Sequence, residues 1–279
     1  ERGVLDFLLE QREQGRIRHL GWSFHGDMET LDYVLSRNVR WDFALVQLNY
    51  HDLLHQLVPS VAQRRRVKEP APARWMFERM QESGLPLMVM EPLLGGRLAR
   101  LNKKALTILQ EEDPQASAAS WAFRYAGSLP NVLTVLSGMT YLEHLQDNVR
   151  TFAPLKPCTE KDILVLEKAV AAFASGENIP CTTCGYCMPC PYGVDIPTVF
   201  LNHNHCLDDE QVPREERDPE YDSARRAYLV NLARRVPQSQ DAAHCTGCGK
   251  CVKLCPQFID IPGEMARLGK FAEDLRLRG

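Results

Sequence analysis

Eight of the ten cysteines in this 279-residue chain fall into two short runs in its last hundred residues. The runs hold Cys181, Cys184, Cys187 and Cys190, then Cys245, Cys248, Cys251 and Cys255. A proline, Pro191 or Pro256, follows the last cysteine of each run. Three thiolates at two-residue spacing can hold one face of an iron–sulfur cube, and the cysteine before the proline is directed to another metal centre. The spacing therefore predicts two 4Fe-4S clusters.

Zinc and disulfide bonds are the two other uses of such cysteines. Structural zinc usually takes two Cys-x-x-Cys pairs far apart in sequence, so a third and fourth cysteine at the same interval would be surplus. Disulfides need an oxidising compartment, but the chain shows no apolar signal segment and its first 157 residues contain no cysteine. Iron–sulfur clusters are favoured over both alternatives, and a cytoplasmic location is expected.

Two runs of this kind suggest the ligand exchange of two-cluster ferredoxins, in which the last cysteine of each run binds the other cluster. The first cluster would then use Cys181, Cys184, Cys187 and Cys255. The second cluster would use Cys245, Cys248, Cys251 and Cys190. The first run has two residues before its last cysteine where three are usual, so it departs from the ferredoxin pattern there.

Composition excludes several classes of protein. The chain is 44% hydrophobic and 25% charged with a formal net charge of −3, which is typical of a soluble protein of about two domains. It has no apolar stretch long enough to span a membrane, and its charge balance gives no nucleic-acid footprint. We therefore expect neither a membrane nor a nucleic acid as partner.

Upstream of the cysteines, short apolar runs alternate with helical patterns. The predicted strands cover residues 17–22, 43–48, 87–90 and 132–136, and the predicted helices cover 27–37, 73–83, 114–125 and 140–151. Four strand–helix units imply parallel strands with right-handed crossovers. Either a doubly wound sheet or part of a barrel satisfies this pattern. No glycine-rich dinucleotide fingerprint follows a strand, which counts against the doubly wound sheet.

A complete barrel needs eight such units, and only four are present. We expect that the N-terminal half of a barrel is missing from this stretch, because four parallel strands alone leave an apolar interior open. The alternative is a native half-barrel that pairs with another chain.

Phrases at the strand ends make the pattern more specific. They are Gly15–Gly26 (GRIRHLGWSFHG), Val46–Tyr50 (VQLNY), Met90–Gly96 (MEPLLGG), Leu136–Met139 (LSGM) with Asn148, Pro180–Pro191 (PCTTCGYCMPCP) and Val194–Pro197 (VDIP). In this order they resemble the iron–sulfur branch of the aldo/keto reductase family over nearly the whole chain. The resemblance implies the C-terminal half of a (β/α)8 TIM barrel, residues 1–157, a connecting helix, 158–178, and a mostly α-helical two-cluster ferredoxin-like domain, 179–279.

The resemblance also implies a nicotinamide nucleotide, NADP or NAD, at the barrel rim, with hydride transfer to a small carbonyl or from an alcohol. Ser23 and Gln47 match residues that hold the nicotinamide carboxamide. The remaining matches are Leu93, Gly95 and Gly96 in the pyrophosphate loop, and Ser137, Gly138, Met139 and Asn148 at the adenosine end. Phe24 and Met90 depart from common family residues near the nicotinamide. His144 stands roughly where an arginine often meets the 2′-phosphate in the family, which leaves the choice between NADP and NAD open.

The family's catalytic Asp, Tyr, Lys and His belong to the first half of the barrel, so no catalytic residue can be assigned here. Two functions follow. One is an oxidoreductase whose clusters pass single electrons to or from a redox partner protein, with a flavin as the intermediary that a hydride donor would need. The alternative is a non-catalytic iron–sulfur electron-transfer or interaction module, and a weaker third reading makes the clusters oxygen sensors.

Overall fold

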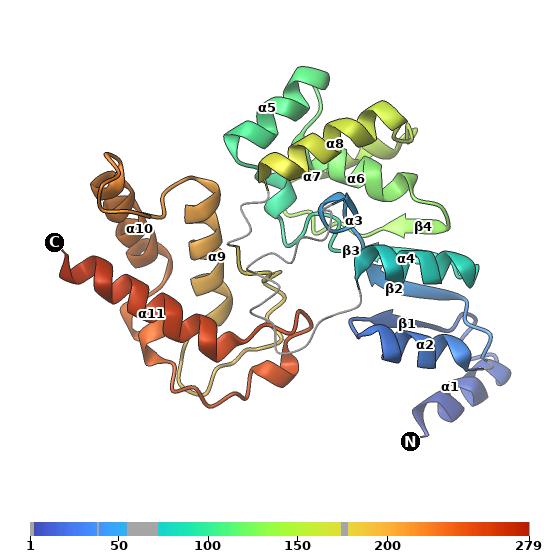
Figure 1. Ribbon diagram of the computed structural model, residues 1–279. Coiled ribbons are helices and arrows are strands. Elements are labelled where there is room, and N and C mark those ends of the chain that lie inside the picture. The colour runs from blue at the N-terminus through green and yellow to red at the C-terminus, as the bar shows by residue number, and fades with distance from the viewer. Residues whose placement is uncertain (1–2, 38, 55–71, 174–177, 279) are drawn as a thin grey trace. The chain divides into compact units, whose positions relative to one another are not determined.

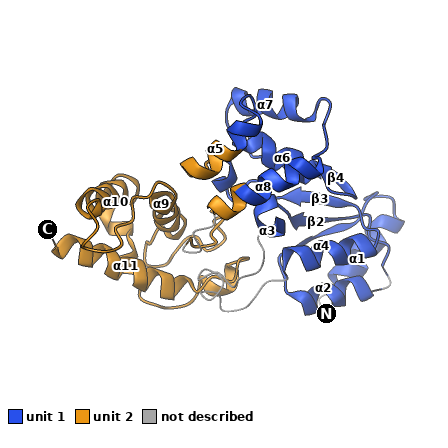
Figure 2. Cartoon of the chain, turned by 45° about the horizontal axis from the view of Figure 1, so that its top comes forward, with its two compact units in different colours: residues 1–55, 70–99, 109–168 blue, residues 56–69, 100–108, 169–279 orange. Residues whose placement is uncertain are grey.

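The structure of the chain is a computed structural model that describes residues 3–37, 39–54, 72–173 and 178–278. It divides into two compact units (Figure 2): residues 1–55, 70–99 and 109–168 form the first, and 56–69, 100–108 and 169–279 the second. Helix α8, Glu160–Phe173, continues across this division. The predicted domain boundary at residue 157 lies just before this helix, whereas the division between the two units lies within it.

The first unit is built on a four-stranded parallel sheet in the order β1-β2-β3-β4 (Figure 1). The strands are β1 (Gly21–Phe24), β2 (Phe43–Gln47), β3 (Leu87–Met90) and β4 (Val132–Val135). In the register of the sheet Phe24 lies beside Val46 and Gln47 beside Met90. The carboxyl ends of all four strands consequently meet at one edge, as a strand–helix repeat with parallel pairing requires.

Helices separate the strands and supply most of the core. They are α1 (Val4–Glu13), α2 (Met28–Ser36), α3 (Tyr50–Leu54), α4 (Ala73–Glu82), α5 (Lys103–Glu112), α6 (Ala118–Ser128) and α7 (Leu142–Phe152), with a short 3-10 turn, η2 (Arg97–Ala99). Asp27 caps α2 by accepting a hydrogen bond from the Thr30 N–H at 2.8 Å. Trp121 of α6 and Val46 and Val89 of the sheet are among the buried core residues.

Two predicted elements were wrong at their start. The first strand begins at Gly21 and not at residue 17, because the Ile17 N–H bonds back to the end of α1 and the Leu20 N–H donates to the Asp42 carboxylate at 2.7 Å. Helix α6 begins at Ala118 and not at residue 114, because Ser117 provides its cap, accepting from the Ser120 N–H. In both cases a side-chain acceptor upstream or opposite the segment decides the boundary.

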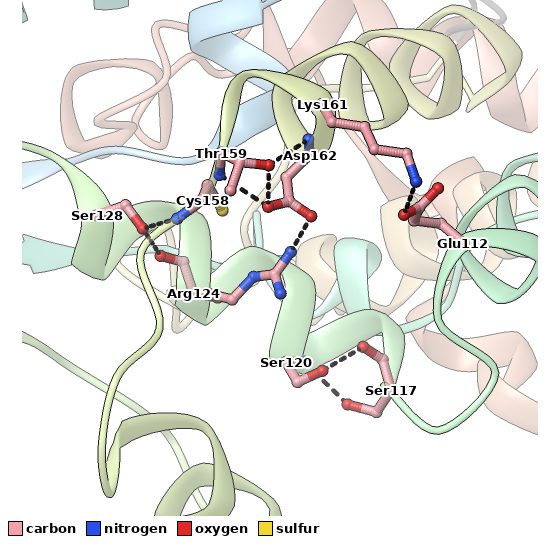
Figure 3. A network of polar contacts seen from close by, with 9 residues as sticks. All are labelled: Glu112, Ser117, Ser120, Arg124, Ser128, Cys158, Thr159, Lys161 and Asp162. Atoms are coloured by element: carbon pink, nitrogen blue, oxygen red, sulfur yellow. Dashed lines mark hydrogen bonds and ion pairs between the residues drawn. The ribbon is translucent and has the colours of Figure 1, made fainter.

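A polar network ties α6 to α8 (Figure 3). The Arg124 guanidinium donates to Asp162 Oδ1 at 2.6 Å, and the other Asp162 oxygen accepts from the Thr159 N–H at 2.7 Å. Lys161 also pairs with Glu112 of α5 at 2.5 Å. Cys158 lies in this network, where its N–H donates to Ser128 Oγ and burial raises the pKa of its thiol. This cysteine is a packing residue, in keeping with its place outside both runs.

Among the described strands, β1 and β4 form the two edges of the sheet. None of the residues of α7, all of them described, is buried, and this helix exposes Leu142, Leu145, Val149 and Phe152. Leu133 of β4 is likewise 65% exposed. Exposed apolar side chains on one helix and on an edge strand are typical of faces that another segment covers.

The second unit is helical, as predicted. It takes in residues 100–108, which include the start of α5, and the end of α8. Its other helices are α9 (Ile196–Asp208), α10 (Tyr221–Arg235) and α11 (Ile261–Leu277), and its short 3-10 turns are η3 (Gln238–Gln240), η4 (Ala242–His244) and η5 (Val252–Leu254). Helix α10 contacts both α9 and α11, and its buried Tyr228 and Leu232 belong to one core with Phe200 and Met265. Among the described residues, no helix has the length and apolar character needed to cross a membrane.

Candidate functional site

The cysteines of the two runs line two neighbouring hollows in the second unit. The small hollow is bordered by Cys181, Cys184, Cys187 and Cys255. The large hollow is bordered by Cys190, Cys245, Cys248 and Cys251, and also by Cys187. Each hollow therefore combines three cysteines of one run with the last cysteine of the other. The fold brings together the two sets that the exchanged ligand scheme requires, and the assignment of ligands stays a prediction.

The two hollows differ in volume. The large hollow has a volume of about 290 Å³ and the small one about 20 Å³. Cys184 in the small hollow and Cys248 in the large one are exposed, whereas the other six cysteines of the runs are half-buried. All ten cysteines lie within the described residues, and each is a free thiol.

Burial makes these thiols hard to ionise without a cation. Burial raises the pKa of Cys181 to about 12, an effect that the Thr183 N–H bond to its sulfur partly offsets and nearby thiols, including that of Cys255, increase. For the same reasons the pKa of Cys187 is raised to about 11, with Cys184 and Cys255 as neighbours. A set of thiolates packed this closely fits a positively charged iron–sulfur core.

The cysteine runs differ from a single-ion site in their ligand count. Within the part of the chain that the structure describes, no group of three or more His, Cys, Asp or Glu side chains is placed to hold one ion. Four-coordinate zinc needs its sulfurs about 2.3 Å from one centre. The eight cysteines of the runs line the two hollows in sets of four or more, which matches the four ligands of a 4Fe-4S cluster.

The two cysteine loops share a backbone conformation. Thr183 and Gly247 lie at φ 56° and 71°, and Gly185 and Gly249 at 77° and 70°. A left-handed conformation favours glycine, so Thr183 adopts at some cost what Gly247 adopts freely. The loops that carry the first three cysteines of each run therefore share a backbone conformation. The runs differ after them, where the first has a cis Met188–Pro189 peptide bond and the second forms η5.

Side chains of helix α9 hold both ends of the first loop. Asp195 caps α9 after the loop by accepting from the Thr198 N–H at 3.2 Å. Before the loop, Asn204 binds the backbone of Ile179 twice: its Oδ1 accepts from the N–H at 2.9 Å and its Nδ2 donates to the carbonyl at 2.8 Å. The Ile179 carbonyl also accepts from the Cys181 N–H at 2.7 Å. Asn204 thus fixes the entry to the first cysteine.

The residues that the resemblance assigns to the nucleotide lie at the carboxyl edge of the sheet in the first unit. Ser23 is in β1 and Gln47 ends β2. Ser23 Oγ lies 3.4 Å from Nε2 of His25, a ring whose pKa is lowered by burial. Asn148 of α7 donates to Ser137 Oγ at 2.9 Å, so these two members of the adenosine group are in contact. Gly138 and Met139, beside Ser137, are exposed.

The loop after β3 is held by a residue that the sequence interpretation missed. The Gly95 N–H donates to Glu91 Oε2 at 2.6 Å, and burial raises the pKa of Glu91 while this bond lowers it. Leu93 accepts from the Leu98 N–H at 3.0 Å, and Gly96 is exposed at φ 87° with open space around it. A phosphate that used the Gly95 N–H would have to displace the Glu91 carboxylate. The sequence feature that could have indicated this bond is the carboxylate of Glu91, which lies within the Met90–Gly96 segment.

A parallel strand–helix sheet with its candidate residues at the carboxyl edge, joined to a helical region with two cysteine hollows, defines an iron–sulfur protein with a barrel-type oxidoreductase fold. The aldo/keto reductase family profile matches residues 2–170, and the 4Fe-4S binding domain profile matches residues 239–258. The chain belongs to the aldo/keto reductase family. The predicted family and the predicted barrel half followed by a mostly helical iron–sulfur region are confirmed.

Solved structures show the same likeness at low identity. The chain is similar to the thermostable aldo-keto reductase Tm1743 in complex with the inhibitor epalrestat, with 22% identity and a TM-score of 0.43, covering 59% of this chain and 53% of that one. The chain is also similar to the holo form of aldo-keto reductase AKR11C1 from Bacillus halodurans, with 22% identity and a TM-score of 0.42, covering 58% of this chain and 53% of that one. The apo form of Gox0644 is similar with 15% identity and a TM-score of 0.44, and the match covers 63% of this chain and 56% of that one. The chain spans about half the length of these structures, and no curated protein matches it.

Proposed function

We propose that this chain forms the nucleotide-binding and electron-transfer part of an NAD(P)H-dependent oxidoreductase. One observation carries the proposal: a family barrel rim and two cysteine-lined hollows lie on the same chain. A nicotinamide nucleotide supplies hydride, and 4Fe-4S clusters store single electrons. The two electrons of one hydride match one electron for each of two clusters.

The chain's own residues fit the nucleotide in part. The Ser23 hydroxyl and the Gln47 amide can bind a carboxamide, and the open space around Gly96 allows a phosphate to approach the backbone. The Glu91 carboxylate opposes an anion at Gly95. Carbonyl reduction also needs a proton donor, which in this family belongs to the other half of the barrel. The substrate and the choice between NADP and NAD are therefore parts of the proposal that rest on the complete barrel.

Cluster reduction in the complete polypeptide tests the function. Under anaerobic conditions NADPH with a catalytic amount of free flavin should bleach the visible absorbance of the clusters, because a flavin accepts a hydride and releases single electrons. Dithionite serves as the control that both clusters can be reduced. If dithionite bleaches the clusters but NADPH and NADH do not, with or without flavin, the coupling of nucleotide to clusters is rejected. The chain would then be a non-catalytic electron-transfer module.

We also propose that a redox partner protein docks at the large hollow. Tyr192 and Leu254 border this hollow and are 49% and 53% exposed. The segments 181–194 and 245–259 contain no Asp or Glu, although the whole chain carries more acidic than basic residues. Lys250 and Lys253 are their only charged residues, and both are exposed. An apolar surface with a cationic rim suits an acidic one-electron carrier.

Reversal of this charge should slow electron exchange. For the double variant Lys250→Glu/Lys253→Glu we expect the rate of cluster reduction by a reduced acidic ferredoxin to fall about tenfold at low salt and to approach the unmodified rate at high salt. Stopped-flow absorbance measures the rate. Lys103→Glu/Lys104→Glu makes the same charge change at two exposed lysines of α5 that border neither hollow, and should have little effect. Equal slowing by both double variants would contradict docking at the large hollow.

The cytoplasm is the proposed location, because a chain with ten cysteines, none of them in a disulfide bond, suits a reducing compartment.

A further inference from the structure

Three residues border both hollows. They are Cys187, Ile196 and Ile261, and they appear in the lining of the small and of the large hollow alike. Ile196 and Ile261 are only 3% and 2% exposed, so water reaches neither side chain from outside. The two hollows are therefore adjacent, and two buried aliphatic side chains and one thiol stand between them.

The two isoleucines are equivalent positions of an internal repeat. After each Cys-Pro pair the chain continues for two residues and then reads Val194-Asp195-Ile196-Pro197 or Ile259-Asp260-Ile261-Pro262. The two aspartates play the same part, since Asp195 accepts from the Thr198 N–H and Asp260 from the Gly263 N–H, each at 3.2 Å. In both copies the isoleucine is the first residue of a helix, α9 or α11.

This placement brings two helix N-termini to the hollows. Ile196 and Pro197 of α9 border the small hollow, and Ile261 and Pro262 of α11 border the large one. The N-terminus of a helix carries partial positive charge, which favours a negatively charged centre beside it. The first turn of each helix therefore supplies two things: its partial positive charge lies beside one hollow, and its isoleucine lies between the two hollows.

We propose that Ile196 and Ile261 form a dry partition that couples the two cluster sites and sets both reduction potentials. The inference rests on the proposed two-cluster function. One electron leaves the reduced cluster on one side and enters the oxidised cluster on the other, with no bond made or broken and no proton moved. The isoleucines are positioning residues: they exclude water from the space between the clusters, and solvent exposure is one of the factors that set a cluster's potential.

Two pairs of substitutions separate the partition from ordinary core packing. Ile261→Ala should raise the midpoint potentials of both clusters, because water entering beside both centres stabilises the more negative reduced state. Ile259→Ala is the matched control: it makes the same change two residues earlier, is also 2% exposed, and borders the small hollow alone. It should move one potential. In the other copy Ile196→Ala should again move both, whereas Val194→Ala, bordering the large hollow alone, should move one.

Redox titration of the complete polypeptide, followed by electron paramagnetic resonance, gives the potentials and the magnetic interaction between the reduced clusters. Where an alanine variant does not fold, Ile261→Val and Ile196→Val provide the same comparison with less volume removed. The proposal is supported if each isoleucine variant shifts both midpoint potentials and each control variant shifts only one. The spectrum of the fully reduced protein should also show interacting spins. Two clusters whose spectra simply add, or a single shifted potential for Ile261→Ala, overturn it while leaving the two-cluster function intact. A protein that binds one cluster would overturn both.

Discussion

Replacement of Cys190 by alanine should remove the cluster of the large hollow and leave that of the small hollow in place. Cys190 belongs to the first run in sequence, yet it borders the hollow formed by Cys245, Cys248 and Cys251. Loss of one of four thiolate ligands exposes a cluster to dissociation, because the ligands hold it covalently. We expect the iron and sulfide content per chain to fall by about half, and one of two sets of paramagnetic signals to disappear.

The reciprocal variant provides the control for this prediction. Cys255→Ala changes a cysteine of the second run that borders the small hollow, so it should remove the other set of signals. Cys158→Ala, outside both runs, should leave the iron content unchanged. If Cys190→Ala instead removes the signals that Cys181→Ala removes, each cluster takes its four ligands from one run and the exchanged scheme is wrong.

The sequence predicted the parts of this structure that depend on local pattern. The spacing of the cysteines carries its own geometry, because thiolates two residues apart in a tight loop can face one centre. The strands of the sheet were found because buried parallel strands read as short apolar runs, and β3 was predicted at its observed bounds, Leu87–Met90. Element type is thus encoded locally in this chain.

What could not be predicted depends on contacts between distant segments. Leu20 lies outside β1 because Asp42 accepts its N–H, and nothing near Leu20 in the sequence announces that bond. The position of Glu91 against Gly95 reverses the charge expected in a phosphate loop, and only the fold shows it. Likewise, Ile196 and Ile261 look like ordinary apolar residues until the two hollows are seen to share them. The Asp-Ile-Pro sequence that follows both cysteine runs was the one feature that could have pointed to these two isoleucines.

Asn204→Asp should weaken the second unit and preferentially destabilise the cluster of the small hollow. Asn204 is 1% exposed and bonds both backbone groups of Ile179, whose carbonyl also accepts from the Cys181 N–H. A carboxylate can still accept from the Ile179 N–H, but it sets an oxygen against the Ile179 carbonyl at a buried position. A buried hydrogen bond lost from one side costs about 1–3 kcal/mol, and the buried charge adds to this cost. We expect a loss of about 3 kcal/mol in the apparent free energy of unfolding.

Asn202→Asp provides the matched control on the same helix. Asn202 is also fully buried, but its Oδ1 accepts from Arg235 at 3.1 Å and its Nδ2 has no hydrogen-bond partner, so a carboxylate there would face a guanidinium. Its cost should be the smaller of the two, and the clusters should stay bound. Anaerobic urea titration with iron analysis measures stability and cluster retention together. Equal losses from the two variants, or a small-hollow cluster that survives Asn204→Asp unchanged, would mean that the bonds to Ile179 do not position Cys181.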